Sequence, residues 1–290
     1  MPTTTSMKHS PLISIVTPSF NQADFIVEAL ESVRSQNADN YEHLVIDGMS
    51  TDGTVDLLRN HAANTERKTM LWISERDTGQ SEALNKGFQR AKGEIIGWLN
   101  SDDRYRPNCF EYVVRAFEEN PDVDIVYGDY LMVDALGKVL KIRREIEFSP
   151  FVLRYHHVLY IPTTATFFRR RVFDEGNRLD ETLQYAMDLE FFIRLSDLGY
   201  RFKHIPRLLA DFRMQPNSKT CSHPEGQRME HRKVVLGAAP IVRRFRNPRI
   251  TGLALVLFGS IAGVRRYWEK LLKGYYWEQS RPNSSGPANT

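Results

Sequence analysis

Short apolar runs alternate with amphipathic stretches from residue 12 to about residue 127 of this chain. The apolar runs are rich in β-branched and aromatic residues, and each is bounded by residues that favour turns. Such alternation predicts βα units that build a mainly parallel sheet flanked by helices. The predicted strands are residues 12–17, 42–47, 70–74, 94–100 and 124–128.

Helical spacing of apolar residues is found between these runs, over residues 25–33 and 83–91. Beyond residue 128 the pattern weakens to a hairpin around 135–138, an apolar run at 164–168 and a helix at about 188–198. No repeat or low-complexity linker separates the halves, so we expect one α/β domain. The predicted organisation is a disordered start (1–10), the domain (11–222), a helical tail (223–279) and a disordered end (280–290).

With 290 residues, of which 41% are hydrophobic and 26% charged, the chain is long enough to bury a large core. The first ten residues, MPTTTSMKHS, lack the apolar stretch of a signal peptide, so a cytoplasmic protein is expected. Cys109 and Cys221 are the only cysteines and do not have the spacing of a zinc site. Both are interpreted as free thiols.

The net charge of +3 hides an acidic body and a basic tail. Residues 228–281 contain 12 Lys and Arg against 3 Asp and Glu, a net charge of +9, which leaves −6 for the rest of the chain. Such a tail favours an anionic partner.

The tail contains fifteen uncharged residues, 250–264, bordered by RRFRNPR and RRYWEKLLKGYYW. As a helix this stretch reaches about 22 Å, which is short of a hydrocarbon core of about 30 Å, so we do not expect a complete crossing. Basic and aromatic flanks favour a helix in the interface of an anionic membrane, at the inner face of the cell membrane. The alternative is a helix buried against the domain or against another subunit.

Polar residues follow four of the predicted strands, at Thr17-Pro18-Ser19, Asp47, Glu75-Arg76-Asp77 and Asn100-Ser101-Asp102-Asp103. In an open α/β sheet, ligands bind beyond the carboxyl ends of the strands. Asp102 and Asp103 would repel each other unless a cation or backbone donors compensate them, and Mg²⁺ or Mn²⁺ with a diphosphate suits such a pair. The alternative is a solvated turn.

Two further carboxylates allow both a functional and a structural interpretation. Asp47 precedes a turn-forming stretch, and its carboxylate either organises that turn or accepts a hydrogen bond from a nucleobase. Asp188 lies where a helix begins, and it either caps that helix or serves as a general base toward a hydroxyl.

Four segments together resemble family 2 glycosyltransferases with the GT-A fold, of the kind that builds bacterial polysaccharides and lipid-linked glycans. The match covers roughly residues 12–220, and its order and spacing are specific. The segments are SIVTPSFNQ (14–22), VIDGMSTDGT (45–54), SERDTGQSEALNKGFQRAKGEIIGWLNSDD (74–103) and YAMDLEFFIRL (185–195).

The resemblance implies an inverting, metal-dependent transfer from a nucleotide sugar, with UDP as the usual nucleotide and Mn²⁺ or Mg²⁺ as the cofactor. It assigns Asp188 as the catalytic base, and Asp102 and Asp103 as the carboxylates that hold the metal. Residues implied in donor binding are Pro18, Ser19, Asp47, Asp77, Lys86 and Asp102.

This chain departs from the family pattern at two positions. Asn100 stands where many relatives have Asp, which weakens one possible metal or ribose contact, and Met187 stands where the family often has Glu before the base. The segment 212–220 resembles a mobile loop that closes over the donor, or it is an ordinary surface loop. Weaker candidates for the site are Glu190, Arg213, Lys219 and Asn100.

The resemblance also implies a hexosyltransferase that acts on a saccharide or polyprenyl-linked acceptor, and no role for nucleic acid. The Gln-x-x-Arg-Trp signature of polymerising members is missing, which favours a single transfer over chain synthesis. A sugar-nucleotide pyrophosphorylase is one alternative, although PSFNQADF offers no glycine-rich phosphate loop. A non-catalytic membrane-associated scaffold that retains the fold is the other.

Overall fold

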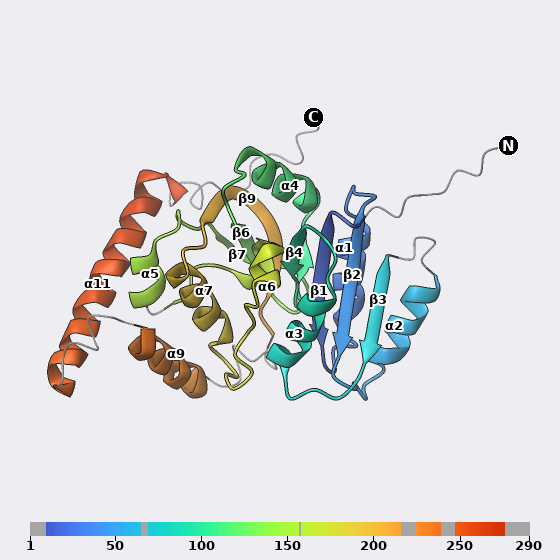
Figure 1. Cartoon of the computed structure of the whole chain (residues 1–290), viewed down its shortest axis with the longest axis horizontal. Helices are drawn as coiled ribbons and strands as arrows, with labels where there is room; N and C mark the ends of the chain where they lie inside the picture. Colours follow the sequence, from blue (N-terminus) through green and yellow to red (C-terminus); the bar gives the residue numbers. More distant parts are fainter. Residues whose placement is uncertain (1–9, 65–68, 157, 216–223, 239–246, 276–290) are drawn as a thin grey trace.

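A computed structural model describes residues 10–64, 69–156, 158–215, 224–238 and 247–275. It contains one central sheet with helices packed on both faces. Two further helices, from the C-terminal part of the chain, lie at one end of the molecule (Figure 1). The predicted α/β architecture is confirmed, with a helical C-terminal region.

The sheet is a single hydrogen-bonded array in which strand order differs from sequence order. Its order is β3-β2-β1-β4-β8-β6-β9-β5, and β7 pairs with β6 outside this path. The strands are β1 (Ile13–Ser19), β2 (Tyr41–Asp47), β3 (Met70–Ser74), β4 (Ile95–Trp98), β5 (Arg104–Tyr105), β6 (Ile125–Val133), β7 (Val139–Arg143), β8 (Thr166–Arg169) and β9 (Phe202–Arg213).

Strand direction places several strand ends at the same edge of the sheet. β1 is parallel to β2 and β4, and β2 is parallel to β3. β8 is antiparallel to both β4 and β6, so β6 runs in the direction of β4, and β9 is parallel to β6. The carboxyl ends of β1, β2, β3, β4 and β9 therefore point the same way, which gathers the loops that follow them.

Alternating side chains of the strands face two different cores, because successive side chains of a strand point to opposite faces. Val16 and Phe168 pack with helices α3, α5 and α7, whereas Ile15 and Phe167 pack with α1 and α4 on the other face. The helices of the domain are α1 (Ile26–Arg34), α2 (Thr54–Ala63), α3 (Gln80–Arg90), α4 (Cys109–Glu119), α5 (Pro150–Tyr155), α6 (Arg171–Asp174) and α7 (Met187–Asp197), with a 3-10 turn η1 (Thr163–Ala165).

The predicted strands and helices all occur, but β9 was missed by the sequence pattern. β9 carries Pro206 and Arg207 in its middle, and its pairing with β6 shifts register there, between Gly128 and Tyr130. A proline lacks the backbone N–H that a central strand donates, so the sequence around Pro206 does not predict a strand. The shifts leave three residues of β9, Pro206, Arg207 and Leu209, outside the ladder and so accommodate the proline.

Two helices, α9 (Pro224–Ala238) and α11 (Pro248–Leu272), follow the sheet. α9 packs against α7 and α5, and α11 packs against α5 at the side of the molecule away from β1, β2 and β3 (Figure 1). Cys221 and the basic stretch before Pro248 lie outside the described residues, and Cys109 is a buried free thiol.

Helix α3 lies against β1 so closely that only a glycine fits at one point of contact. A Cβ on Gly87 would lie 2.2 Å from Cγ1 of Val16, whose side chain is fully buried. This close approach sets the position of the amino end of α3, which lies near the ends of β1 and β4.

We expect Gly87→Ala to lower the free energy of unfolding by about 1–3 kcal/mol, because overpacking outweighs the gain in helix propensity. Chemical denaturation measures the change. Gly252→Ala in α11 is the matched control, since a Cβ there meets nothing within 4 Å. Equal stability of the two variants would contradict the tight contact.

Candidate active site

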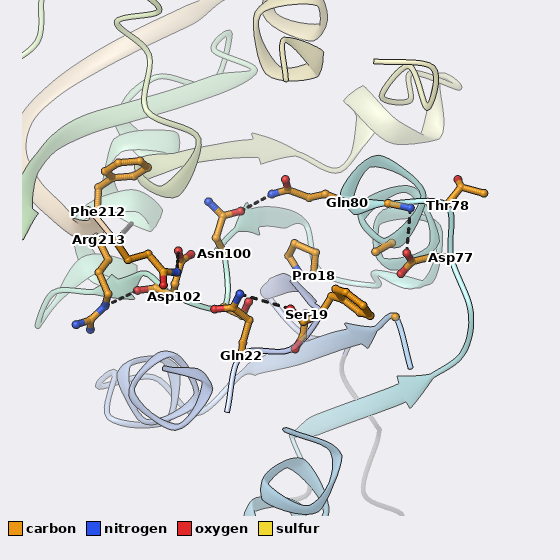
Figure 2. Close-up of a pocket in the computed structure, with 16 residues that line it drawn as sticks. Pro18, Ser19, Gln22, Asp77, Thr78, Gln80, Asn100, Asp102, Phe212 and Arg213 are labelled. Carbon is orange, nitrogen blue, oxygen red and sulfur yellow. Dashed lines mark hydrogen bonds between the residues drawn. The ribbon is translucent and has the colours of Figure 1, made fainter. Parts of the chain in front are cut away.

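A cavity of about 530 Å³ opens at the edge of the sheet where the parallel strands end (Figure 2). In this view Asn100 and Asp102 lie on one side, Asp77 and Thr78 on the other, and Pro18 between them. The lining residues are Pro18, Ser19, Phe20, Gln22, Gly48, Asp77, Thr78, Gly79, Gln80, Ala83, Asn100, Ser101, Asp102, Phe212, Arg213 and Gln215.

The turns after β1 and β2 are joined by side-chain hydrogen bonds. The backbone N–H of Asn21 donates to Ser50 Oγ (2.8 Å), and the N–H of Thr51 donates to Asn21 Oδ1 (2.9 Å). Asn21 has a φ of 52°, in the left-handed region that asparagine tolerates better than most residues. These contacts place Pro18 and Ser19 in the cavity wall and leave Phe20, 60% exposed, at its mouth.

Asp47 lies beneath these turns and is fully buried. Its carboxylate accepts hydrogen bonds from Ser50 N (3.0 Å), Ser50 Oγ (2.5 Å) and Ser74 Oγ (2.7 Å). The structure thus shows the turn-organising arrangement for Asp47. Asp47 itself does not line the cavity, whereas the next residue, Gly48, does.

Asp77 faces the cavity and approaches Gly48 closely. Its Oδ1 accepts from the backbone N–H of Gly79 (3.0 Å), and a Cβ on Gly48 would lie 2.7 Å from its Oδ2. Any larger residue at position 48 would therefore displace this carboxylate. Burial raises the pKa of Asp77.

Lys86 is not brought into the cavity. Its ammonium group contacts Glu82 (2.8 Å) and Glu75 (3.1 Å) and donates to the carbonyl of Arg76 (3.2 Å). These contacts hold the segment after β3 against α3, and Lys86 is not among the described residues that line the cavity.

Asn100 has hydrogen-bond partners at both ends of its amide group. Its Oδ1 accepts from Trp98 Nε1 (2.8 Å) and from Gln80 Nε2 (2.9 Å), and its Nδ2 donates to Asp103 Oδ2 (3.0 Å). An aspartate here would accept where Asn100 donates, and it would place a second negative charge beside Asp103. These hydrogen bonds, in which the side-chain amide both accepts and donates, explain why asparagine suits this position better than aspartate.

Asp102 and Asp103 occupy different environments although they are adjacent. Asp102 lines the cavity, and its Oδ2 accepts from Gln215 Nε2 (2.7 Å). Asp103 is almost fully buried and accepts from Thr164 Oγ1 (2.7 Å), Asn100 Nδ2 (3.0 Å) and the backbone N–H of Arg213 (2.8 Å). Burial raises the pKa of both carboxyls, and the neighbouring charge of Asp102 adds to the rise at Asp103.

Arg213 reaches the cavity wall, but its guanidinium is engaged by the protein. Nε donates to the carbonyl of Asp102 (2.8 Å), Nη1 to the carbonyl of Ala135 (2.6 Å) and Nη2 to Glu28 (2.6 Å). The group also lies over the ring of Phe25, 4.9 Å from its centroid. Arg213 therefore fixes the end of β9 next to Asp102. Lys219, the other basic candidate from this segment, lies outside the described residues.

Asp188 is the second residue of α7 and is partly buried. Its Oδ1 accepts from the N–H of Leu189 (2.7 Å), and burial raises its pKa to about 6. Asp188 is not among the cavity-lining residues that the structure describes. Glu190, on the same helix, forms an ion pair with Arg194 (2.7 Å) and is also not among the described residues that line the cavity.

The segment before α7 runs beside the amino end of α3. Asn85 of α3 donates to the carbonyl of Leu179 (3.0 Å) and accepts from its N–H (2.9 Å). Farther along, Gln184 lies next to the cavity-lining Gly79, because a Cβ on Gly79 would be 3.5 Å from Gln184 Oε1. The chain that leads to Asp188 is thereby held next to the cavity.

Sequence reasoning did not name Gln80 as a lining residue, and it placed Phe212 and Gln215 only within the segment 212–220, which resembles a donor-closing loop or an ordinary surface loop. Gln80 begins α3 directly after Gly79, and a helix start near a strand end is a signal that pointed there. Phe212 lies in the last part of β9 and Gln215 lies two residues after its end, and β9 is a strand that the sequence pattern did not predict. Thr164, the partner of Asp103, gave no signal either.

The residues fit a divalent cation held mainly by its substrate. Among the described residues no group of three or more His, Cys, Asp or Glu forms a protein-only metal site. Mg²⁺ and Mn²⁺ bound with a diphosphate need only one or two carboxylates, however. Asp102, which is partly buried, lines the cavity and has a raised pKa, is such a carboxylate.

Comparison with known proteins identifies a family. Residues 14–176 match the model of Glycosyl transferase family 2. The chain is 27% identical over 236 residues to chondroitin synthase of Escherichia coli, covering 79% of this chain and 33% of the relative. It is 36% identical over 101 residues to the putative teichuronic acid biosynthesis glycosyltransferase TuaG of Bacillus subtilis, covering 35% of this chain and 40% of the relative. The aligned part of this chain thus spans less than half the length of each of these two relatives.

Solved structures of glycosyltransferases share the fold. TarS of S. aureus in complex with UDP-GlcNAc superposes with a TM-score of 0.62 at 18% identity, covering 78% of this chain and 67% of that chain. The mannosyltransferase PcManGT from Pyrobaculum calidifontis, in complex with GDP-Man and Mn²⁺, has a TM-score of 0.63 at 18% identity. That alignment covers 89% of this chain and 74% of the mannosyltransferase. The likeness to these transferases confirms the predicted GT-A fold.

We expect Asn100→Asp to lower the free energy of unfolding by about 1–3 kcal/mol near neutral pH, because Asp103 loses a donor and gains a like charge. Mutual repulsion raises the carboxyl pKa values in the folded state above their unfolded values. The loss therefore grows with pH and is larger at about pH 8 than at about pH 5. Denaturation at both pH values measures it.

The exposed Asn40→Asp serves as the control for the added charge, and its stability should change little at either pH. A loss in Asn100→Asp that is independent of pH would contradict the contact between Asn100 and the Asp103 carboxylate.

Proposed function

This chain belongs to glycosyl transferase family 2, and we propose that it transfers a sugar with inversion from a nucleotide-sugar donor to a hydroxyl of a saccharide or lipid-linked acceptor. The observation that carries the proposal is the partly buried carboxylate of Asp102 that lines a cavity of about 530 Å³. A volume in this range suits a ligand of nucleotide-sugar size. Family membership also argues against a pyrophosphorylase, and the carboxylate that lines the cavity, Asp102, argues against a non-catalytic scaffold.

The donor occupies the cavity from Phe20 to Asp102 in this proposal. The nucleobase lies at the mouth, against Pro18, Ser19 and the exposed ring of Phe20, near the Asp77 carboxylate. The diphosphate lies toward the start of α3, where unpaired backbone N–H groups of a helix attract anions. Asp47 and Lys86 support this site from behind, through the turn after β2 and the segment after β3.

Asp102 is the cavity-facing carboxylate that would hold a divalent cation, with Asp103 as its buried support. When bound, Mn²⁺ or Mg²⁺ would offset the negative charge of the diphosphate. Asp103 is saturated by Thr164, Asn100 and Arg213, so its role in this proposal is to hold the loop that carries Asp102. This assigns the two adjacent aspartates different tasks.

Asp188 is the general base of the proposed reaction. Its carboxylate removes the proton from the acceptor hydroxyl while the oxygen attacks the anomeric carbon opposite the departing nucleoside diphosphate. A pKa of about 6 leaves this carboxylate ionised at neutral pH and more basic than an ordinary aspartate.

We propose UDP as the nucleotide and a single transfer in each encounter.

The tail is proposed to bind an anionic membrane surface through α11. Arg249–Leu272 is long and apolar enough to cross a membrane by length and composition, and little of it is buried. One side of α11 is fixed to the domain, where Arg266 (2.8 Å) and Lys270 (3.1 Å) both contact the buried Glu145. These ion pairs favour a helix that stays on the domain and lies in the membrane plane.

The opposite side of α11 exposes an apolar stripe bordered by the exposed Arg249 and Arg265. Basic and aromatic residues beside an apolar face are typical of helices at an anionic lipid interface. The stripe consists of Ile250, Leu253, Val256, Leu257, Ile261, Val264, Tyr267, Trp268, Leu271 and Leu272. In this proposal the stripe holds the catalytic domain at the membrane, where a lipid-linked acceptor would be found.

Asp188→Asn is expected to lower kcat by roughly 10²–10⁴-fold while donor affinity stays within about threefold, because only proton transfer is lost. Release of nucleoside diphosphate from UDP- and GDP-sugars with Mn²⁺ measures turnover, and calorimetry measures donor binding. Near-normal turnover by this variant would refute the role of Asp188.

The control is Asp197→Asn in the last turn of α7, which removes only an ion pair with Arg154.

In the unsubstituted protein kcat/KM should fall as the pH drops below about 6, since protonation inactivates the base. An acid limb near pH 4 would contradict the assignment.

Replacing both Leu257 and Val264 with Glu should abolish flotation with phosphatidylglycerol vesicles, because two charges would enter the apolar stripe. The matched control replaces Leu136 and Val139 with Glu in the β6–β7 hairpin, where both side chains are also exposed. Flotation by the α11 double variant would refute the proposal. A dimer that dissociates in that variant, without vesicle binding in the parent, would instead assign the stripe to a second copy.

A further inference from the structure

A carboxylate of α9 binds the backbone just before α7. Glu230 accepts hydrogen bonds from three successive backbone N–H groups, those of Gln184 (3.0 Å), Tyr185 (2.7 Å) and Ala186 (3.0 Å). Ala186 is the N-cap residue of α7, so the three donors belong to the N-cap and to the two residues before it. Glu230 therefore holds, from another helix, the backbone that leads into α7.

A second contact joins the same two segments. Gly226 lies one helical turn before Glu230, and a Cβ on Gly226 would lie 2.9 Å from Cε2 of Tyr185. The absence of a side chain on Gly226 lets the Tyr185 ring pack directly against α9. Contacts from both residues on one face of α9 thus determine where the chain enters α7.

The other end of this segment is held by α3. Asn85 binds Leu179 through both its N–H and its carbonyl, and also donates to Glu181 Oε1 (2.9 Å). The chain from Leu179 to Ala186 is therefore fixed at its start by a helix that lines the cavity and at its end by Glu230. Asp188 follows two residues after this second attachment.

We propose that Glu230 is a positioning residue, whose carboxylate orients the first turn of α7 and thereby the Asp188 side chain toward the acceptor hydroxyl. The inference rests on the proposed function of Asp188. Glu230 contacts no reacting atom and acts only through the backbone. Because reactions depend steeply on alignment, a displacement of about 1 Å can lower the rate about 10²-fold.

The proposal also places part of the predicted tail inside the catalytic unit. Residues 223–279 were expected to form a membrane-associating or packing tail, yet Glu230 belongs to this stretch. A chain that ends before α9 would lack the acceptor for three N–H groups at the start of α7.

Two substitutions in α9 test the proposal by different physical routes. Glu230→Gln removes the charge and one of the two acceptor oxygens, whereas Gly226→Ala pushes on Tyr185 and leaves the charge unchanged. The matched controls are Glu225→Gln, an exposed acid in the same helix, and Gly237→Ala, where a Cβ meets nothing within 4 Å.

We expect both test variants to lower kcat by about 10–100-fold while KM for the donor changes by less than about threefold. Amide hydrogen exchange at residues 184–186 should accelerate in Glu230→Gln and stay unchanged in Glu225→Gln. Turnover is measured as nucleoside diphosphate release from UDP- and GDP-sugars with Mn²⁺, using the full chain.

Three outcomes would overturn the positioning role. These are an unchanged kcat in Glu230→Gln, an equal loss in the control variants, or a rise in donor KM that accounts for the whole effect. Failure of the proposed function gives a different result, because Asp188→Asn would then turn over normally. If Asp188→Asn is inactive and Glu230→Gln is fully active, only the positioning role is refuted.

Discussion

The buried carboxylate of Asp103 is the interaction on which the candidate site depends. It accepts hydrogen bonds from Asn100 after β4, from Thr164 before β8 and from the backbone of Arg213 at the end of β9. Three distant parts of the chain meet at this one side chain. Because a buried charge is costly without donors, the surrounding residues must keep this arrangement for the fold to be stable. The same contacts present Asp102, the adjacent residue, to the cavity.

The charged residues near the cavity divide into those that face it and those that support it. Asp77 and Asp102 face the cavity, and burial raises the pKa of each. Asp47 and Lys86 bind the turns behind the wall instead, and Arg213 uses its guanidinium to join the end of β9 to Asp102. These contacts hold the turns and the strand end that carry the cavity-facing carboxylates.

Helices beyond the sheet add to the site rather than only covering it. α9 places Glu230 at the start of α7, and α11 is attached to the domain through Glu145, Arg266 and Lys270. Glu145 is fully buried, so the loss of its cationic partners would leave an uncompensated buried charge. This attachment gives the exposed stripe of α11 a fixed direction relative to the domain, and through α5 and α9 also relative to α7.

The sequence by itself determined the β-strands and helices near the amino end, and it located the polar residues after β1, β2, β3 and β4. Those features depend on local periodicity and turn chemistry, which a single sequence carries. Only the tertiary structure decided that β9, with Pro206 in its middle, ends beside Asp102. It alone separated the role of Asp103 from that of Asp102 and brought Glu230 to α7. These are contacts between residues far apart in the chain, and they depend on how strands are ordered and helices packed, which local patterns do not encode.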